Sequence, residues 1–236
     1  MREKLLKKII SLVFILLIAG GCEERTSTVE STENTTALAE LPYIGEFDVQ
    51  ITTANDGSKY ADTVQYSIPK FSFTNQFGKT VSHRDYEGKI FVAEFFFTTC
   101  TSICPIMSAN MVRLQALTKK EGLQNDVWFL SHSVKPLEDT PDVLLKYGEN
   151  IGADFSNWNF VTGNATDIFE QAQEGYLLTA FPSDTAQGGV FHTDKLALID
   201  RAFHIRGIYD GTTSNGIDQL LQDIQTLKNE YGKSNN

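Results

Sequence analysis

A chain of 236 residues with 20 Lys and Arg against 30 Asp and Glu carries a formal charge of −10, a balance that repels nucleic-acid phosphates. We therefore expect no nucleic-acid partner. Hydrophobic residues make up 41% of the chain, which is enough for one core of ordinary size, and no internal repeat divides it.

The first 21 residues have the pattern of an export signal. Arg2, Lys4, Lys7 and Lys8 precede an apolar run over residues 9–19, and Gly20-Gly21-Cys22 follows. The run is shorter than the roughly 20 residues that span a bilayer. We predict that residues 1–21 are a lipoprotein signal peptide and that Cys22 becomes lipidated, although Ala19 stands where Leu is usual. An uncleaved signal anchor, with Cys22 an ordinary thiol, is the alternative.

Both alternatives place the remaining chain outside the cytoplasm, and lipidation would hold it on the periplasmic side of the cell envelope. Residues 22–40 are rich in Thr, Ser and Glu, a composition typical of a disordered tether. Removing residues 1–21 takes away four basic residues and one acidic residue, which leaves 16 against 29 and a formal charge of −13. We expect one folded domain over residues 41–236.

Hydrophobic periodicity and turn residues predict alternating strands and helices in this domain. In chain order we expect a hairpin over 71–82, a buried strand over 89–97, a helix from Cys104, a strand over 126–134, a helix over 139–152, a short strand over 157–163, a helix over 164–173, a hairpin over 195–211 and a helix over 214–231. Residues 175–191 have no clear period. The pattern predicts an α/β fold with a mixed central sheet flanked by helices and extended by hairpins.

Two cysteines lie where the buried strand gives way to the helix. With Cys22 assigned to the lipid, Cys100 and Cys104 are the remaining thiols, in a compartment that favours oxidation. A disulfide closing so short a loop adds little stability, so chemistry is the better reason for the pair. Cys104, just before Pro105, lies in a first helical turn, which favours the thiolate. The two sulfurs are spaced to bond each other or to hold one metal ion; two incidental cysteines are the alternative.

Glu94 is the one charged residue inside the apolar strand, six residues before Cys100. A buried carboxylate is costly unless it is paired or protonated. The active site of thioredoxin has a buried acid at the same offset, where it moves protons for the cysteine pair. Glu94 is therefore a candidate proton acceptor, and a solvated edge position is the alternative.

His192 is the candidate third ligand among four histidines. It follows the aperiodic loop and opens the predicted strand of the second hairpin, and the preceding Gly188-Gly189 give the loop freedom to bring an imidazole over the cysteines. Two thiolates and an imidazole suit copper, Cu(I) or Cu(II), whereas zinc would need a fourth ligand or a water.

The other histidines and two methionines have weaker claims. We expect His83, His132 and His204 to be structural or surface residues. Among them His132 is the strongest alternative candidate, because strand ends near the cysteine loop can face one cleft. Met107 and Met111 share a helix face with Cys104 and are more typical of core than of thioether ligands.

Three blocks of sequence resemble, in order and spacing, the signature blocks of the Sco/SenC family of membrane-tethered copper proteins. They are "FFFTTCTSICP", "LSHSVKPLEDTPDVLLKYGENIGADFSNWNFVTG" and "VFHTDKLALIDRAFHIRGIYDG", and the match covers about 68–227. The resemblance implies a thioredoxin-like fold and a metallochaperone that assembles the CuA centre of cytochrome c oxidase, by delivering copper or by reducing the acceptor's cysteines. Its partners would be the copper-centre subunit of the oxidase and a thiol reductant protein.

Carried over by position, the family's metal ligands fall on Cys100, Cys104 and His192. Two positions depart from the family pattern: Thr101 stands where Pro is common, and Lys135 replaces the acid of "SVDP". The change to Lys135 puts in doubt what that carboxylate contributes to partner docking or to the site.

Two other functions compete with the copper chaperone. A thioredoxin-like thiol-disulfide reductase acting on exported proteins would need Cys100, Cys104 and Glu94 but not His192, and this is the one enzymatic hypothesis. A redox-sensing or purely interacting lipoprotein would show neither metal affinity nor turnover. The first two can coexist, because reduced cysteines are a precondition for binding Cu(I).

Overall fold

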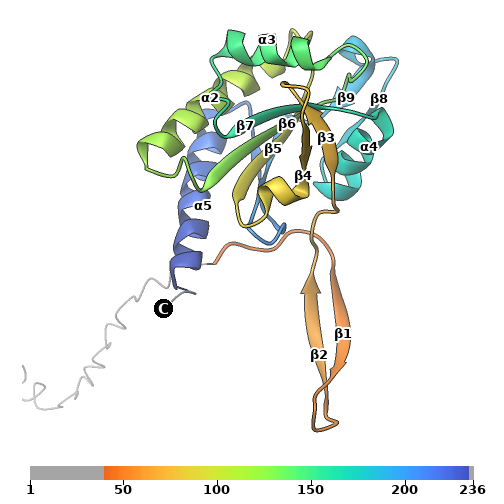
Figure 1. Ribbon diagram of the computed structural model, residues 1–236, viewed down its shortest axis with the longest axis vertical. Helices are drawn as coiled ribbons and strands as arrows, with labels where there is room; N and C mark the ends of the chain where they lie inside the picture. The colour runs from red at the N-terminus through yellow and green to blue at the C-terminus, as the bar shows by residue number, and fades with distance from the viewer. Residues whose placement is uncertain (1–39, 234–236) are drawn as a thin grey trace, which may run out of the picture. The chain divides into compact units, whose positions relative to one another are not determined.

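The computed structural model describes residues 40–233, and Figure 1 shows a mixed sheet with helices on both faces. The predicted signal peptide and the lipidated Cys22 lie outside the described residues, as does nearly all of the tether. Within the described range, no helix has both the length and the apolar character that crossing a bilayer requires.

The central sheet has seven strands in the order β11-β10-β5-β6-β7-β3-β4. Their bounds are β3 (Ser72–Asn75), β4 (Thr80–Ser82), β5 (Ile90–Phe96), β6 (Val127–Ser133), β7 (Trp158–Thr162), β10 (Lys195–Ile199) and β11 (Ile205–Asp210). β5 pairs with β6 in parallel, as does β6 with β7, whereas β10 lies antiparallel to β5 and β3 antiparallel to β7. The predicted mixed sheet is confirmed, together with both predicted hairpins, β3-β4 and β10-β11.

The helices cover the sheet on two sides. They are α2 (Cys104–Lys120), α3 (Pro141–Ile151), α4 (Ala165–Glu170) and α5 (Ser214–Lys233), with the short helical turns η1 (His83–Tyr86), η2 (Gln171–Gly175) and η3 (Gln187–Gly189). α2 contacts α3 through a hydrogen bond between Ser108 and Tyr147, and it contacts α5 through Arg113 and Asp218. The predicted helix over 164–173 is present, but its last three residues belong to the π-helical turn η2.

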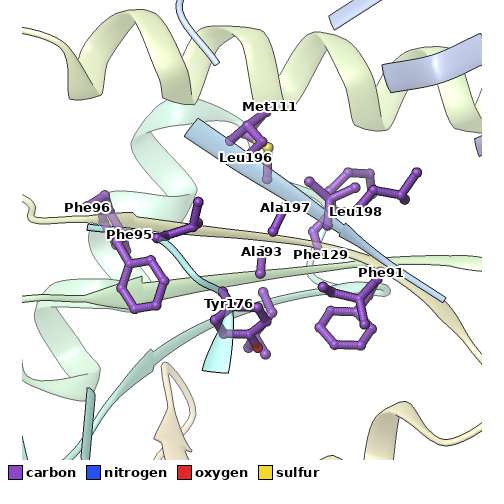
Figure 2. Packing of buried hydrophobic residues seen from close by; sticks show 14 of the residues in the cluster. Phe91, Ala93, Phe95, Phe96, Met111, Phe129, Tyr176, Leu196, Ala197 and Leu198 are labelled. Carbon is purple, nitrogen blue, oxygen red and sulfur yellow. The ribbon is translucent and has the colours of Figure 1, made fainter. Parts of the chain in front are cut away.

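Strand β5 is the centre of the core because every residue from Ile90 to Phe96 is buried. Its side chains alternate between the faces. Phe91 and Phe95 contact Tyr176, whereas Phe96 contacts Tyr147 of α3 on the opposite face. Figure 2 shows this two-sided packing, with Met111 of α2 on one side of the sheet and Tyr176 on the other.

Two strand pairs were not predicted from the sequence. β1 (Phe47–Thr53) and β2 (Lys59–Gln65) form a separate antiparallel hairpin whose side chains are nearly all exposed, and it stands off from the main sheet in Figure 1. β8 (Ala180–Pro182) and β9 (Val190–His192) pair within the aperiodic loop. His192 therefore ends a short strand of its own, and the prediction that it opens the strand of the second hairpin was wrong.

Candidate metal centre

The topology of the sheet brings the two sequence regions of the site together. The loop that carries Cys100 leaves the carboxyl end of β5, and α2 begins at Cys104. Because β10 runs antiparallel to β5, with Ala197 opposite Ala93, the start of β10 lies beside the end of β5. His192, three residues before β10, thus reaches the cysteines although it is 88 residues beyond Cys104.

Cys100, Cys104 and His192 form one compact group. The Sγ atoms of both cysteines and a ring nitrogen of His192 all lie within 4.8 Å of one another. The Sγ of Cys104 is 3.4 Å from Nε2 of His192, and both cysteines are free thiols. The convergence expected from the sequence is therefore present in the fold.

The imidazole of His192 is oriented by the chain itself. Its Nδ1 lies 3.0 Å from the carbonyl oxygen of Thr193, so Nδ1–H donates to that oxygen and Nε2 faces Cys104. The ring lies nearly perpendicular to that of Phe97, with the two ring centroids 5.6 Å apart. Burial lowers the pKa of His192, which keeps the ring neutral, and a neutral imidazole with its second nitrogen engaged is the usual state of a metal-binding histidine.

The pKa values of the two thiols are shifted in the opposite sense to the sequence prediction, which made Cys104 the thiolate. Burial raises the pKa of Cys104 well above its usual range, and its hydrogen bond to Cys100 raises it further. Burial alone would also raise the pKa of Cys100, but hydrogen bonds from the thiol of Cys104, from Ser102 and from the backbone N–H groups of both residues lower it on balance. The prediction of a Cys104 thiolate was wrong because burial of this sulfur outweighs its favourable place in the first turn of α2.

Glu94 is buried, with only 1% of its surface exposed, so the alternative of a solvated edge position is excluded. Its Oε1 accepts a hydrogen bond from Ser131 at 2.7 Å, and Oε2 has no partner among the described residues. Burial raises the pKa of Glu94 to about 7, an effect that the Ser131 bond only partly offsets. A carboxyl group that titrates near neutrality can both give and take a proton at physiological pH.

A buried acid that the sequence analysis did not single out holds the cysteine loop. The carboxylate of Asp139, 1% exposed, accepts hydrogen bonds from the backbone N–H and hydroxyl of Thr98 and from the hydroxyl of Ser133. It thereby ties the loop before Cys100 to the end of β6. From the sequence, its position just before α3 indicates a role at the start of that helix, and no local pattern predicts its hydrogen bonds to Thr98.

The other candidate residues lie outside the group. Met107 and Met111 are fully buried in the core, as expected for core residues rather than thioether ligands. His132 is also fully buried, with its Nδ1 3.2 Å from the backbone oxygen of Glu94. Burial lowers the pKa of His132 to about 3, so this ring is a neutral core residue.

Lys135 is close to the group without joining it. Its Nζ binds Glu138 at 2.6 Å and lies 5.4 Å from the ring centroid of Phe97, the ring that contacts His192. The positive charge is thus paired within the chain. Lys135 reaches the group only through an aromatic neighbour.

The sheet order and the thiol pair at the start of α2 define a thioredoxin-like protein, and the histidine facing the pair separates it from a simple dithiol protein. The chain belongs to the SCO1/SenC family, whose model matches residues 60–229.

Solved structures agree with this assignment. The chain is 34% identical to a SCO1/SenC family lipoprotein from Bacillus anthracis, with a TM-score of 0.64 over 69% of this chain and 95% of that one. It is 32% identical to BsSco, described as a member of the Sco family of cytochrome c oxidase assembly proteins with a disulfide switch, with a TM-score of 0.62 over 69% and 93% of the two chains. ScoI from Arabidopsis thaliana with copper bound, 20% identical, shares the fold with a TM-score of 0.57 over 68% and 99%.

Proposed function

We propose that this protein binds copper as cargo through Cys100, Cys104 and His192 and assists assembly of the CuA centre of cytochrome c oxidase. The observation that carries the proposal is the approach of three soft or borderline donor atoms to within 4.8 Å of one another. Ligands about 2.0–2.3 Å from one ion are roughly 3.5–4 Å apart, so small side-chain adjustments suffice. The donor set of two thiolates and one imidazole suits copper in a low-coordinate site, whereas zinc would need a fourth ligand or a water to complete its tetrahedron.

The relatives support both parts of the proposal. Arabidopsis thaliana ScoI was crystallised with copper, and BsSco is described as belonging to a family of cytochrome c oxidase assembly proteins. The partner inferred here is accordingly the copper-centre subunit of the oxidase, to which this protein either delivers copper or supplies reducing equivalents for the acceptor's cysteines.

A membrane-tethered location completes the proposal. It assigns residues 1–21 to a lipoprotein signal peptide, Cys22 to the lipid anchor, residues 22–40 to the tether and residues 41–236 to the functional domain. The export pattern of the sequence and the lipoprotein relative from Bacillus anthracis support this assignment. The domain then faces the periplasmic side of the envelope.

Anaerobic copper titration of the wild type and His192→Ala tests the copper site. We expect one copper per wild-type chain, and we expect His192→Ala to lose stable Cu(II) while both thiols remain titratable. His83→Ala is the matched control, because it removes an imidazole from η1, outside the group. Unchanged Cu(II) binding in His192→Ala would refute the assignment of the third ligand.

Thiol-disulfide exchange is a second candidate function, favoured by the lowered pKa of Cys100 beside a protonated Cys104. Glu94 would act as the proton acceptor for Cys104, and an exported thiol reductant protein would restore the dithiol. Single-turnover reduction of a peptide disulfide distinguishes this function from copper binding. Exchange should persist in His192→Ala and be abolished in Cys100→Ala, and the reverse pattern would contradict it.

A further inference from the structure

The cysteine-histidine group opens to solvent through a pocket of about 250 Å³. Cys100 and His192 line this pocket, while Cys104, 1% exposed, lies behind them. The described lining contains no Asp, Glu, Lys or Arg; its other members include Ile103, Val190 and Phe191. An incoming ligand therefore meets Cys100 first, through an uncharged mouth in a protein of formal charge −10.

The short β8-β9 hairpin forms one side of this mouth and has two different faces. Ala180 pairs with His192, and both are buried; Phe181 pairs with Phe191, and both are exposed, at 43% and 45%. Successive residues of a strand point to opposite faces. The ladder that places the imidazole against Cys104 thus places two phenyl rings on its outer face, stacked with centroids 5.2 Å apart.

The apolar surface continues past the pocket. Val190 also lines a neighbouring groove of about 260 Å³, to which Pro182 and Leu137 contribute. Leu137 is 95% exposed, and the two charged residues of this groove, Lys135 and Glu138, are paired with each other. Exposed apolar patches next to a functional pocket are typical of binding surfaces, and aromatic residues are enriched where such binding is strongest.

We propose that this rim, composed of Leu137, Phe181, Val190 and Phe191, docks an extended apolar segment of the acceptor protein and guides its cysteine to Cys100. The inference deepens the proposed function and rests on it, since copper or thiol exchange requires an incoming sulfur in the pocket. The absence of charge from the described lining favours an apolar flank over an acidic or basic one. The rim therefore selects the acceptor by the residues around its cysteine.

The test uses two 12-residue peptides with one central cysteine activated as a 2-pyridyl disulfide. One has Leu, Val and Phe flanks, and the other has Ser and Gln flanks. The Cys100 thiolate attacks the peptide sulfur, a mixed disulfide forms, the bond to the pyridyl sulfur breaks, and pyridine-2-thione leaves with a proton from solvent. The absorbance of the released thione gives the second-order rate constant for the full chain.

The wild type should react at least about tenfold faster with the apolar peptide than with the polar one. The double variant Phe181→Ser/Phe191→Ser should reduce this preference to less than threefold, and 2,2′-dithiodipyridine, which has no peptide flanks, reports the reactivity of Cys100 itself in each protein. Phe47→Ser, which removes a more exposed phenyl ring from β1, is the matched control and should keep the preference.

Equal wild-type rates with the two peptides, or a double Ser variant that keeps the preference, would overturn the proposal. If 2,2′-dithiodipyridine also reacts more slowly with the double Ser variant, the pocket itself has changed, and the variant Phe181→Leu/Phe191→Leu is used instead. A retained preference for the apolar peptide in that variant supports the rim. A lost preference overturns it. Copper titration separates a failure of the proposed function from a failure of the rim proposal. A peptide preference without copper binding refutes the proposed function alone, and copper binding without a preference refutes the rim alone.

Discussion

Cys100 and Cys104 are four residues apart, and their surroundings move the pKa values of their thiols in opposite directions. Because the thiolate is the reactive form, and each pKa unit changes its fraction about tenfold below the pKa, Cys100 should react first. We predict that limiting iodoacetamide at pH 7 modifies Cys100 more than about tenfold faster than Cys104. Peptide mapping by mass spectrometry measures the two rates.

Each single cysteine variant gives a control for this order. Cys104→Ala should retain a rapidly alkylated thiol, although its pKa rises because it loses the hydrogen bond from Cys104. Cys100→Ala should react slowly, since the remaining sulfur is 1% exposed. Faster modification of Cys104 than of Cys100 in the wild type would contradict the predicted order of reactivity.

Glu94 makes stability depend on pH. Its folded pKa is about 7 against an ordinary value of 4.5, so the folded state binds more protons between these values and the free energy of unfolding falls as pH rises. The loss is complete above about pH 7 and amounts to about 3 kcal/mol. Glu94→Gln should remove it, because the amide can still accept the Ser131 bond and does not ionise.

Guanidinium unfolding at pH 5, 6, 7 and 8 measures this effect as the difference between Glu94→Gln and the wild type. The difference should grow in favour of the variant up to about pH 7 and then stay constant. Comparison at each pH cancels the contribution of His132, whose lowered pKa makes stability rise with pH over an overlapping range. Glu149→Gln, at an exposed position of α3, is the matched control. A flat difference for Glu94→Gln would mean that its carboxyl is ionised throughout.

Two loops at the carboxyl ends of the central strands β5 and β6 depend on the carboxylate of Asp139. Asp139→Ala leaves the Thr98 N–H and the Ser133 hydroxyl without their acceptor, so we predict a loss of about 2–4 kcal/mol in the free energy of unfolding. Guanidinium unfolding measures it. The adjacent Glu138→Ala removes only a partly exposed ion pair and should cost less than about 1 kcal/mol. Equal costs for the two variants would exclude a structural role specific to Asp139.

The β1-β2 hairpin contributes little to stability despite its apolar residues. Phe47, Val49 and Ile51 alternate along β1 and are 62%, 59% and 65% exposed, so each forfeits little burial when replaced. We predict that each substitution by Thr changes the free energy of unfolding by less than about 0.5 kcal/mol. Thermal and guanidinium unfolding test this, with the fully buried Val92→Thr of β5 as a control that should cost about 1–3 kcal/mol.

Local pattern was enough to predict the elements of the main sheet, because strands such as β5 are buried on both faces and read as continuous apolar runs. The β1-β2 hairpin also has a local signal that was not used: apolar and polar residues alternate in β1, and the turn residues Asn55-Asp56-Gly57 follow. β8-β9 has none, since its strands are three residues long and form only because the chain folds back over the site.

The candidate site was predictable in composition and not in detail. Cys100, Cys104 and His192 could be chosen because the spacing of the cysteines and the glycines before the histidine are local features. The order of the two thiol pKa values depends on how deeply each sulfur is buried and on which sulfur accepts hydrogen bonds, and both are properties of the folded loop. The contact between Asp139 and Thr98 joins residues 41 positions apart and has no local signal.

At the scale of the whole molecule, the segment just before β1 is held by the far edge of the sheet. Arg206, 3% exposed, donates hydrogen bonds to the carbonyl oxygens of Leu41 and Pro42, the N–H of Leu41 binds Glu230, and Ile44 pairs with Ile205.

We predict that the chain shortened to residues 40–236 keeps its stability within about 0.5 kcal/mol, because these contacts remain. Shortening to residues 47–236 strips buried partners from Arg206 and should cost about 2–4 kcal/mol, measured by guanidinium unfolding. Copper stoichiometry should be the same in both, since the cysteine-histidine group lies beyond residue 96; equal stability of the two shortened chains would show that the segment is not an integral part of the domain.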